Sequence, residues 1–74
     1  MTLKNTHSAE EVEGKFCHLK TDNGNISGKV KSVQVNKKSK LIESVDILLV
    51  TDNYSKAKKI KAEDFENVDI VKVS

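Results

Sequence analysis

Residues 21–33, T-D-N-G-N-I-S-G-K-V-K-S-V, limit most strongly what this chain can fold into. Gly24 closes a cluster of turn-forming residues, and Gly28 follows four positions later inside an alternation of apolar and polar residues. A tight turn that leads into a glycine-bearing strand is typical of a hairpin that bends sharply. The alternation then slips by one residue around Lys31 and Ser32, which predicts a bulge or sharp bend. The stretch therefore predicts the curled second strand of a small, strongly bent sheet.

The chain has 74 residues and is expected to fold as a single domain over residues 1–74. A domain of this size buries only about 60% of the surface that its unfolded chain exposes. Its core is therefore small, and association with further copies is a common way to enlarge it. The one cysteine, Cys17, excludes an intramolecular disulfide, and one cysteine with two histidines at unrelated positions does not make a four-ligand metal site. We therefore expect no metal or other cofactor, and a free thiol fits a reducing, cytoplasmic location.

Charge and hydropathy narrow the classes of partner further. The first residues lack the apolar segment of a signal peptide, and no stretch approaches the roughly 18 apolar residues of a membrane helix. We therefore expect no membrane partner. Charged residues make up 32% of the chain but the net charge is only +2, so the placement of the charges matters more than their sum. All thirteen basic residues are lysines, which contact phosphates as point charges rather than as bidentate forks.

Local patterns predict one short helix followed by five strands, which makes the chain mostly β. Residues 1–7 are polar and are expected to be loose. Ser8 and Glu11 have the spacing of a capping box, and Gly14 suits the position after a helix end, so a short helix is expected over residues 8–13. Alternating apolar and polar residues then predict five strands within residues 15–73, at 15–21, 26–35, 44–51, 55–61 and 68–73.

Two of the predicted strands carry apolar residues on both faces. In strand 44–51 the two apolar sets are offset by one residue, which predicts a central strand that is buried on both sides. Asp46 interrupts this strand and is expected to pair with a lysine of the second strand. Strand 68–73 is also apolar on both faces, and a terminal strand of this kind needs a second partner.

This order of elements resembles the Sm-like family, the small barrels that include the LSm and Hfq proteins. The resemblance covers nearly the whole chain, although Leu19 and Gly28 are one residue further apart than in the family's first motif, roughly L-x-x-G-x-x-x-x-G-x-L. The residues that carry it are Gly14, Asp22, Gly24, Gly28, Val30, the strand over 45–50, and Ile60 with Lys61. The resemblance implies that the bent antiparallel sheet forms a small SH3-like or Sm-like barrel.

The resemblance also implies a homo-oligomer. In Sm-like proteins strand four of one subunit pairs with strand five of the next and closes a ring, which removes both sheet edges. The residues expected at this subunit interface are Lys58, Ile60, Val68, Ile70 and Val71.

RNA binding is the activity that the resemblance implies, at the loop between strands two and three and at the second motif. The family's Met-Asn pair is missing from the loop, where Ser44 falls near the Asn position. The second motif, usually Ile-Arg-Gly, is here Ile60-Lys61-Ala62, which keeps the charge but loses the guanidinium fork and the glycine. We therefore expect contacts made mostly by lysines to phosphates. The candidate RNA-binding residues are Asn36, Lys37, Lys38, Lys40, Ser44 and Lys61.

A second hypothesis is a structural or protein-interaction module, an SH3-like or Tudor-like adaptor that has lost RNA recognition. The missing Met-Asn and Ile-Arg-Gly elements favour it, and the loop lysines would then be a solvated tip. With two Phe and one Tyr in the chain, an aromatic cage for methyl-lysine is not expected. The four lysines within residues 55–61 also have a simpler interpretation, since lysines on an edge strand repel unwanted pairing.

Tyr54 and the adjacent pair Cys17 and His18 are two further candidate sites. Tyr54, before the fourth strand, either stacks on a base or packs over its hairpin. Cys17 and His18 are neighbours in a strand and therefore point to opposite faces, which argues against a shared metal or nucleophile site. Neither a Ser/His/Asp arrangement nor a phosphate-cradling glycine loop is visible, so the chain is not expected to be an enzyme.

Overall fold

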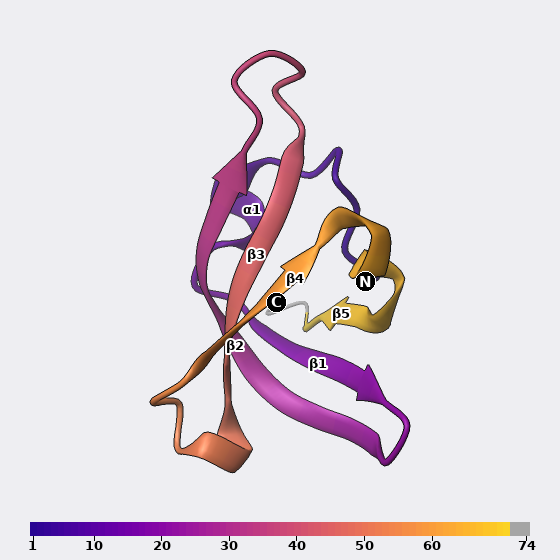
Figure 1. The fold of residues 1–74 in the computed structure, drawn as a ribbon, viewed down its shortest axis with the longest axis vertical. Helices are drawn as coiled ribbons and strands as arrows, with labels where there is room; N and C mark the ends of the chain where they lie inside the picture. Colours follow the sequence, from indigo (N-terminus) through magenta and orange to yellow (C-terminus); the bar gives the residue numbers. More distant parts are fainter. Residues whose placement is uncertain (72–74) are drawn as a thin grey trace.

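The computed structural model describes residues 1–71 and contains one antiparallel sheet of five strands preceded by a short helix (Figure 1). The strands are ordered β4-β3-β2-β1-β5 across the sheet. This confirms the predicted mostly β fold, while the sheet itself is not closed, because β4 and β5 are its two ends. In chain order the elements are α1 (Ala9–Val12), β1 (Phe16–Thr21), β2 (Gly24–Val35), β3 (Ile42–Leu49), the 3-10 helix η1 (Val50–Asp52), β4 (Ala57–Lys61), the 3-10 helix η2 (Ala62–Asn67) and β5 (Val68–Ile70).

The helix α1 begins and ends where the sequence predicts. The backbone N–H of Glu11 donates to Ser8 Oγ at 3.3 Å, and the backbone N–H of Ser8 donates to Glu11 Oε1 at 3.4 Å, which completes the capping box. Gly14 follows the helix with φ +81°, a left-handed conformation that glycine adopts without steric cost. A helix of one turn is not stable alone, so α1 is held by the fully buried side chain of Val12.

Gly28 lies in the middle of the sheet, opposite Cys17 of β1 and Leu49 of β3. A Cβ added there would lie only 2.8 Å from both the Leu48 carbonyl oxygen and the Ile47 Cγ2. Because one of these atoms is backbone, β2 and β3 can approach this closely only when residue 28 has no side chain. The predicted role of Gly28 in a sharply bent strand thus has a steric basis.

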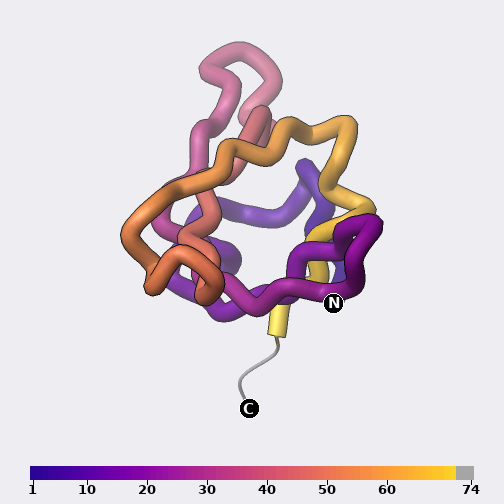
Figure 2. Tube along the Cα trace, turned by 60° about the horizontal axis from the view of Figure 1, so that its bottom comes forward, coloured from indigo at the N-terminus to yellow at the C-terminus, as the bar shows by residue number. Residues whose placement is uncertain are grey.

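The predicted slip in β2 is a real irregularity of the sheet. The register between β2 and β3 shifts between Val30 and Ser32, so Lys31 is the extra residue of a bulge. A second shift occurs between Gln34 and Val35. Bulges increase the local twist and bend the strand. Figure 2 shows the result, a chain that curls round so that the two ends of the sheet come round toward each other.

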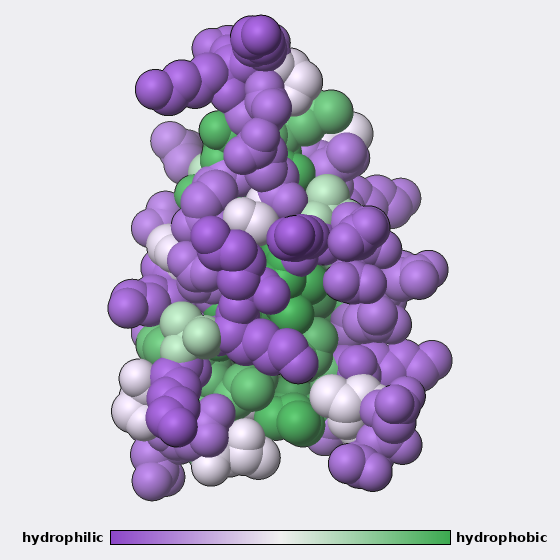
Figure 3. All heavy atoms as spheres, in the orientation of Figure 1, coloured by the Kyte–Doolittle hydropathy of each residue, from purple (hydrophilic) through white to green (hydrophobic). Residues whose placement is uncertain are grey.

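The core lies on the inner, concave face of the sheet. Apolar side chains also reach the surface in a strip down the middle of the face seen in Figure 3, between hydrophilic side chains on both sides. The buried apolar residues are Leu3, Val12, Cys17, Leu19, Val30, Ile42, Val45, Ile47, Leu49, Ile60, Phe65, Val68 and Ile70. They come from every strand, from α1 and η2, and from the segment before α1.

β3 is central in the sheet, but the outer-face apolar residues of the predicted strand 44–51 are not fully buried, which corrects the expectation that it is buried on both sides. Val45, Ile47 and Leu49 point into the core, whereas Leu48 is half-buried and Val50, now in η1, is 42% exposed. The reason is that the described residues provide no second layer of structure over the outer face of the sheet. The two-sided apolar pattern therefore leaves apolar groups on the surface.

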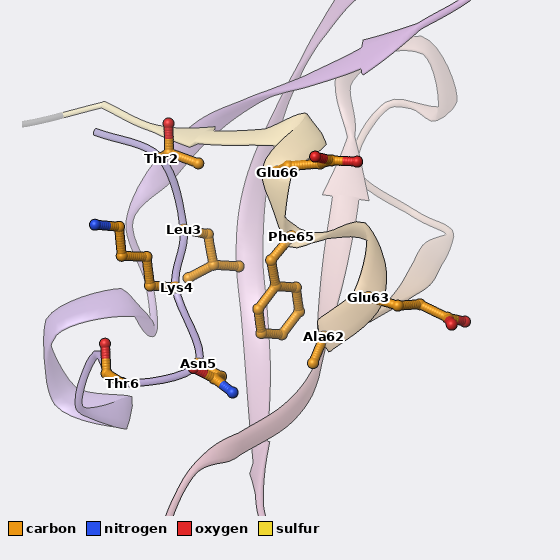
Figure 4. Close-up of a pocket in the computed structure, with 9 residues that line it drawn as sticks. All are labelled: Thr2, Leu3, Lys4, Asn5, Thr6, Ala62, Glu63, Phe65 and Glu66. Carbon is orange, nitrogen blue, oxygen red and sulfur yellow. The ribbon is translucent and has the colours of Figure 1, made fainter.

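The segment before α1 is ordered against β5, although the sequence predicts a loose residue 1–7 stretch. Leu3 is only 2% exposed, and Figure 4 shows its side chain and that of Phe65 pointing toward each other. Thr2 forms an antiparallel bridge with Asp69. β5 ends at Ile70, before the predicted end, and positions 72 and 73 of the predicted strand lie outside the described residues.

Candidate nucleic-acid interface

The lysines of β4 lie on an end strand that pairs only with β3. The register sets Lys59 opposite Asp46 and Lys61 opposite Ser44, so both lysines belong to the outer face. Lys58 lies opposite the buried Ile47 and belongs to the inner side of the strand. Within residues 1–71 the one ion pair joins the Met1 amino group to Asp69 at 2.6 Å, so no described lysine is paired with a carboxylate. The charges of Lys59 and Lys61 are therefore free to meet a ligand.

A network of hydrogen bonds lies beside these lysines and corrects the expectation for Asp46. Its Oδ2 accepts from Ser32 Oγ at 2.8 Å and from Gln34 Nε2 at 3.1 Å, and a lysine of β2 does not pair with it. The bulge at Lys31 is the cause, because it places Ser32 opposite Asp46. Ser44, 7% exposed, donates from Oγ to Gln34 Oε1 at 2.7 Å, so its hydroxyl serves the sheet.

Asn36 shapes the loop between β2 and β3. Its Oδ1 accepts from the backbone N–H groups of Lys38 at 2.8 Å and Ser39 at 3.0 Å. Its Nδ2 donates to Glu43 Oε1 at 2.7 Å. Both ends of the amide are therefore occupied, and Asn36 would have to release one of these bonds to contact a base.

The structure brings together only part of the predicted RNA-binding set. Ser44 and Lys61 line one concavity of about 560 Å³, together with Lys59, Ala62 and two carboxylate residues, Glu43 and Glu63. The loop lysines Lys37, Lys38 and Lys40 do not line it, because the loop projects beyond the sheet, at the top of Figure 1. Two separate basic regions result, one at the loop tip and one on β4.

Lys59 is the site residue that sequence reasoning left out of the RNA-binding set. The signal for it was present, since Lys59 and Lys61 are two residues apart and therefore share a face of a strand. Which face that is depends on the pairing with β3, and the sequence does not supply this register. The Lys61 side chain thus has a neighbour of the same charge on the same surface.

Three of the five predicted interface residues are buried within the single chain. Val68 and Ile70 are buried at 1% and 2% exposure, and Ile60 at 6%, while Lys58 is exposed. The backbone N–H of Val71 donates to the Phe16 carbonyl at 2.8 Å. The β4–β5 contact between subunits therefore stays a prediction. It would have to form through backbone hydrogen bonds between the edge strands, because the apolar side chains are already buried.

The outer edge of β5 is already occupied within the single chain. The Leu3 N–H donates to the Val68 carbonyl at 2.9 Å, and the Ile70 N–H donates to the Met1 carbonyl at 2.6 Å. The Val68 N–H donates to Phe65, at the end of η2. A second copy could pair here only after residues 1–3 had left the edge, whereas no strand among residues 1–71 covers the outer edge of β4.

Cys17 and His18 lie on opposite faces of β1 and do not form a shared site. Burial raises the pKa of the Cys17 thiol from 9.0 to about 11, so the sulfur stays protonated at neutral pH and is a poor nucleophile. His18 lies on the other face of β1, with Nδ1 3.4 Å from Ser27 Oγ. Among residues 1–71 acidic, histidine and cysteine side chains do not gather in groups of three that could hold a metal, and the described part has no helix long and apolar enough to cross a membrane. Comparison with protein-family models, curated proteins and solved structures finds no match.

Proposed function

We propose that the chain is an Sm-like protein that binds single-stranded RNA through lysine–phosphate contacts. The observation that carries the proposal is the pair of exposed lysines, Lys59 and Lys61, which share the outer face of β4 and are not paired with carboxylates. The strand order, the leading helix and the bend at Gly28 support a small barrel of the Sm-like or SH3-like kind. The loop lysines Lys37, Lys38 and Lys40 extend the basic surface.

The contact is electrostatic and independent of sequence. Residues two apart in a strand are separated by about 6.6 Å, a spacing that a flexible single strand can meet with successive phosphates. Lysine ammonium groups offer charge but not the bidentate geometry that discriminates between partners. Binding should therefore weaken steeply with salt, by about 0.7 in the logarithmic slope for each phosphate contacted.

The proposal includes a homo-oligomeric ring. The open edge of β4 in one copy would pair with β5 of the next, in place of residues 1–3 of that copy. Such pairing would remove the open edge of each sheet and bury more apolar surface than one small chain can. The ring would also line up the β4 lysines of successive copies around one surface.

The direct test is fluorescence anisotropy with a labelled single-stranded RNA at several salt concentrations. Lys59→Gln with Lys61→Gln should lower the affinity about tenfold at low salt and reduce the salt slope by about 1.4, since two phosphate contacts are lost. Lys15→Gln with Lys31→Gln is the matched control, because both lysines are exposed and neither lines a concavity that Lys59 or Lys61 lines. Absence of binding to any single-stranded RNA at low salt would overturn the proposal.

A protein-interaction module is the second candidate, and the open edge of β4 favours it. An extended peptide could add to this edge as a further strand, and the four nearby lysines, Lys56, Lys58, Lys59 and Lys61, favour an acidic one. Amide hydrogen exchange separates the two candidates. A paired peptide strand would slow the exchange of β4 amides, whereas RNA held by lysine side chains would leave these rates unchanged.

A further inference from the structure

A second concavity lies on the outer face of the sheet and shares no lining residue with the concavity that Lys59 and Lys61 line. Cross-strand pairing lines up Phe16 of β1, Lys29 of β2 and Leu48 of β3 in one row. Tyr54, from the turn after η1, joins them, and the four side chains line a concavity of about 420 Å³. The proposed lysine–phosphate contact uses none of these residues.

Two of the three aromatic side chains of the protein meet at this concavity. Phe16 is 51% exposed and Tyr54 40% exposed, whereas the third aromatic residue, Phe65, is buried in the core. Leu48, half-buried, lines the same concavity. Two aromatic rings left in solvent around one hollow offer flat apolar surfaces to a ligand.

The backbone places Tyr54 there at a conformational cost. Asn53 and Tyr54 both have positive φ, +53° and +57°. Asparagine tolerates this left-handed region, but for a bulky residue such as tyrosine it is unfavourable, and such outliers gather at functional sites. The Tyr54 N–H donates to the Leu49 carbonyl at 2.9 Å, which holds the turn in place. Glycine or asparagine would adopt this backbone conformation with less strain, so we attribute the tyrosine at this position to its exposed aromatic ring.

Lys29 adds a positive charge to the same hollow. Its Nζ lies 5.7 Å from the centroid of the Phe16 ring, within reach of a cation–π contact. The concavity has no carboxylate among its lining residues. Its chemistry is therefore two aromatic rings and one cation, which matches a base together with the phosphate beside it.

We propose that Phe16, Tyr54 and Lys29 form a second site, which binds an unstacked nucleobase of a single strand and its adjacent phosphate. The site deepens the proposed RNA binding and rests on it. The base would contact both the Phe16 and the Tyr54 ring, so loss of either ring would remove the stacking, and Lys29 would move from the Phe16 ring to the phosphate. Stacking of this kind tolerates every base, so the site adds affinity without adding sequence preference. Lys29 is the charged residue that lines the concavity, and its positive charge favours a strand that carries phosphates over an apolar protein segment.

The first test compares two labelled probes of the same length, a uridine oligomer and an abasic oligomer with the same backbone. Wild-type protein should bind the uridine oligomer about tenfold more tightly, because only that probe can stack. Phe16→Leu should remove this difference while leaving the salt slope unchanged. Val35→Ala is the control, since Val35 is also apolar and 41% exposed but lies outside the concavity. Equal binding of both probes by wild-type protein would overturn the second site and leave the lysine–phosphate contact standing, whereas failure to bind either probe would overturn both.

Tyr54 supplies a direct signal for stacking. The chain has one tyrosine and no tryptophan, so its intrinsic fluorescence reports on this ring alone. The uridine oligomer should quench the emission, and the abasic oligomer should not. Quenching that follows protein concentration without any oligomer would instead assign this face to contacts between copies, and would overturn the proposal.

The variant Tyr54→Asn separates a binding role from a structural one. Asparagine suits the positive φ, so the variant should unfold at a higher urea concentration and yet lose the preference for the uridine oligomer. A variant that is less stable than wild type, with its preference for the uridine oligomer retained, would show that Tyr54 only packs over the turn, and would remove it from the site.

Discussion

The two edge strands of the sheet, β5 and β4, differ: residues 1–3 cover the edge of β5, whereas the edge of β4 carries lysines. β5 has three residues, and its outward backbone groups at Val68 and Ile70 are bonded to residues 1–3. Leu3, which comes with this covering segment, is part of the core. β4 has five residues, pairs only with β3, and buries only Ile60.

The difference separates stability from binding. An edge can be protected by covering it or by placing charges along it. The covered edge adds Leu3 and its neighbour Phe65 to a small core, so the N-terminal segment should contribute to stability. The charged edge adds almost no apolar burial but leaves Lys59 and Lys61 in solvent. We therefore expect mutations near β5 to change unfolding and mutations on β4 to change interactions.

The largest effect is expected for Leu3→Ala, which should lower the free energy of unfolding by about 3 kcal/mol, because the side chain is 2% exposed. Urea denaturation measures the loss. Leu41→Ala is the matched control, since the same atoms are removed from a side chain that is 37% exposed, and it should cost less than about 0.5 kcal/mol. Equal losses in the two variants would show that residues 1–3 do not belong to the core.

The next effect concerns the thiol of Cys17, which lies opposite Ile70 of the covered strand. Its pKa is raised by burial from 9.0 to about 11, so the unfolded chain releases the proton first. The contribution of the thiol to stability is therefore complete below pH 9 and is lost as the pH rises to about 11, by up to about 3 kcal/mol. Urea denaturation of wild type and Cys17→Ala across this range isolates the thiol, because both chains carry the same lysines. If the difference in stability between wild type and Cys17→Ala does not change with pH, the Cys17 thiol is not buried as the structure shows.

A reversible lock tests whether the covered edge controls assembly. The bonds of Leu3 and Met1 to β5 flank Thr2 and Asp69, which makes these two a non-hydrogen-bonded pair. Such pairs have their Cα atoms at a distance that a disulfide can span. Thr2→Cys with Asp69→Cys, in a Cys17→Ala background, should gain about 2 kcal/mol when oxidised.

The oxidised lock should also stay monomeric in light scattering, while the reduced protein associates as its concentration rises. The reduced form of the same variant is its own control. Identical oligomers in both forms would exclude β5 as the assembly edge. A monomer in both forms at every concentration would count against the ring and leave lysine–phosphate binding by the monomer to be judged separately.

The smallest effect on stability is expected on β4. Lys59→Thr with Lys61→Thr should change the free energy of unfolding by less than about 0.5 kcal/mol, because both side chains are exposed. The same variant should self-associate more, since an edge with fewer charges no longer repels pairing. Sedimentation velocity compares it with a variant that carries Lys15→Thr and Lys31→Thr, two exposed lysines that line no concavity with Lys59 or Lys61. Unchanged association would mean that the β4 lysines do not protect this edge.

Several parts of the fold follow from patterns between near neighbours in the chain. The capping box of Ser8 and Glu11, the turn at Gly24 and the slip at Lys31 all appear in the structure as predicted. Each rests on the geometry of a few consecutive residues, so the sequence shows it directly. Ser44 and Lys61, which were each predicted as RNA-binding residues, also lie opposite each other across β3 and β4.

Other features could not be predicted because they depend on which distant segments meet. A one-residue bulge decides that Asp46 bonds to Ser32 rather than to a lysine. Lys59 joins the site through its register with β3, and Leu48 stays half-exposed because the outer face lacks a covering layer.

The sequence of this protein determines its elements and its bend, because strand periodicity, helix caps and glycine turns are set by neighbouring residues. It also determines the absence of arginine, and with it the kind of phosphate contact the chain can make. Only the tertiary structure decided how the two edge strands are covered. The Leu3 N–H donates to the Val68 carbonyl of β5, whereas within residues 1–71 β4 pairs with β3 alone. The physical reason is that a polar stretch such as residues 1–7 has no strand pattern of its own, and becomes ordered only where an unpaired backbone edge and an apolar hollow are already in place.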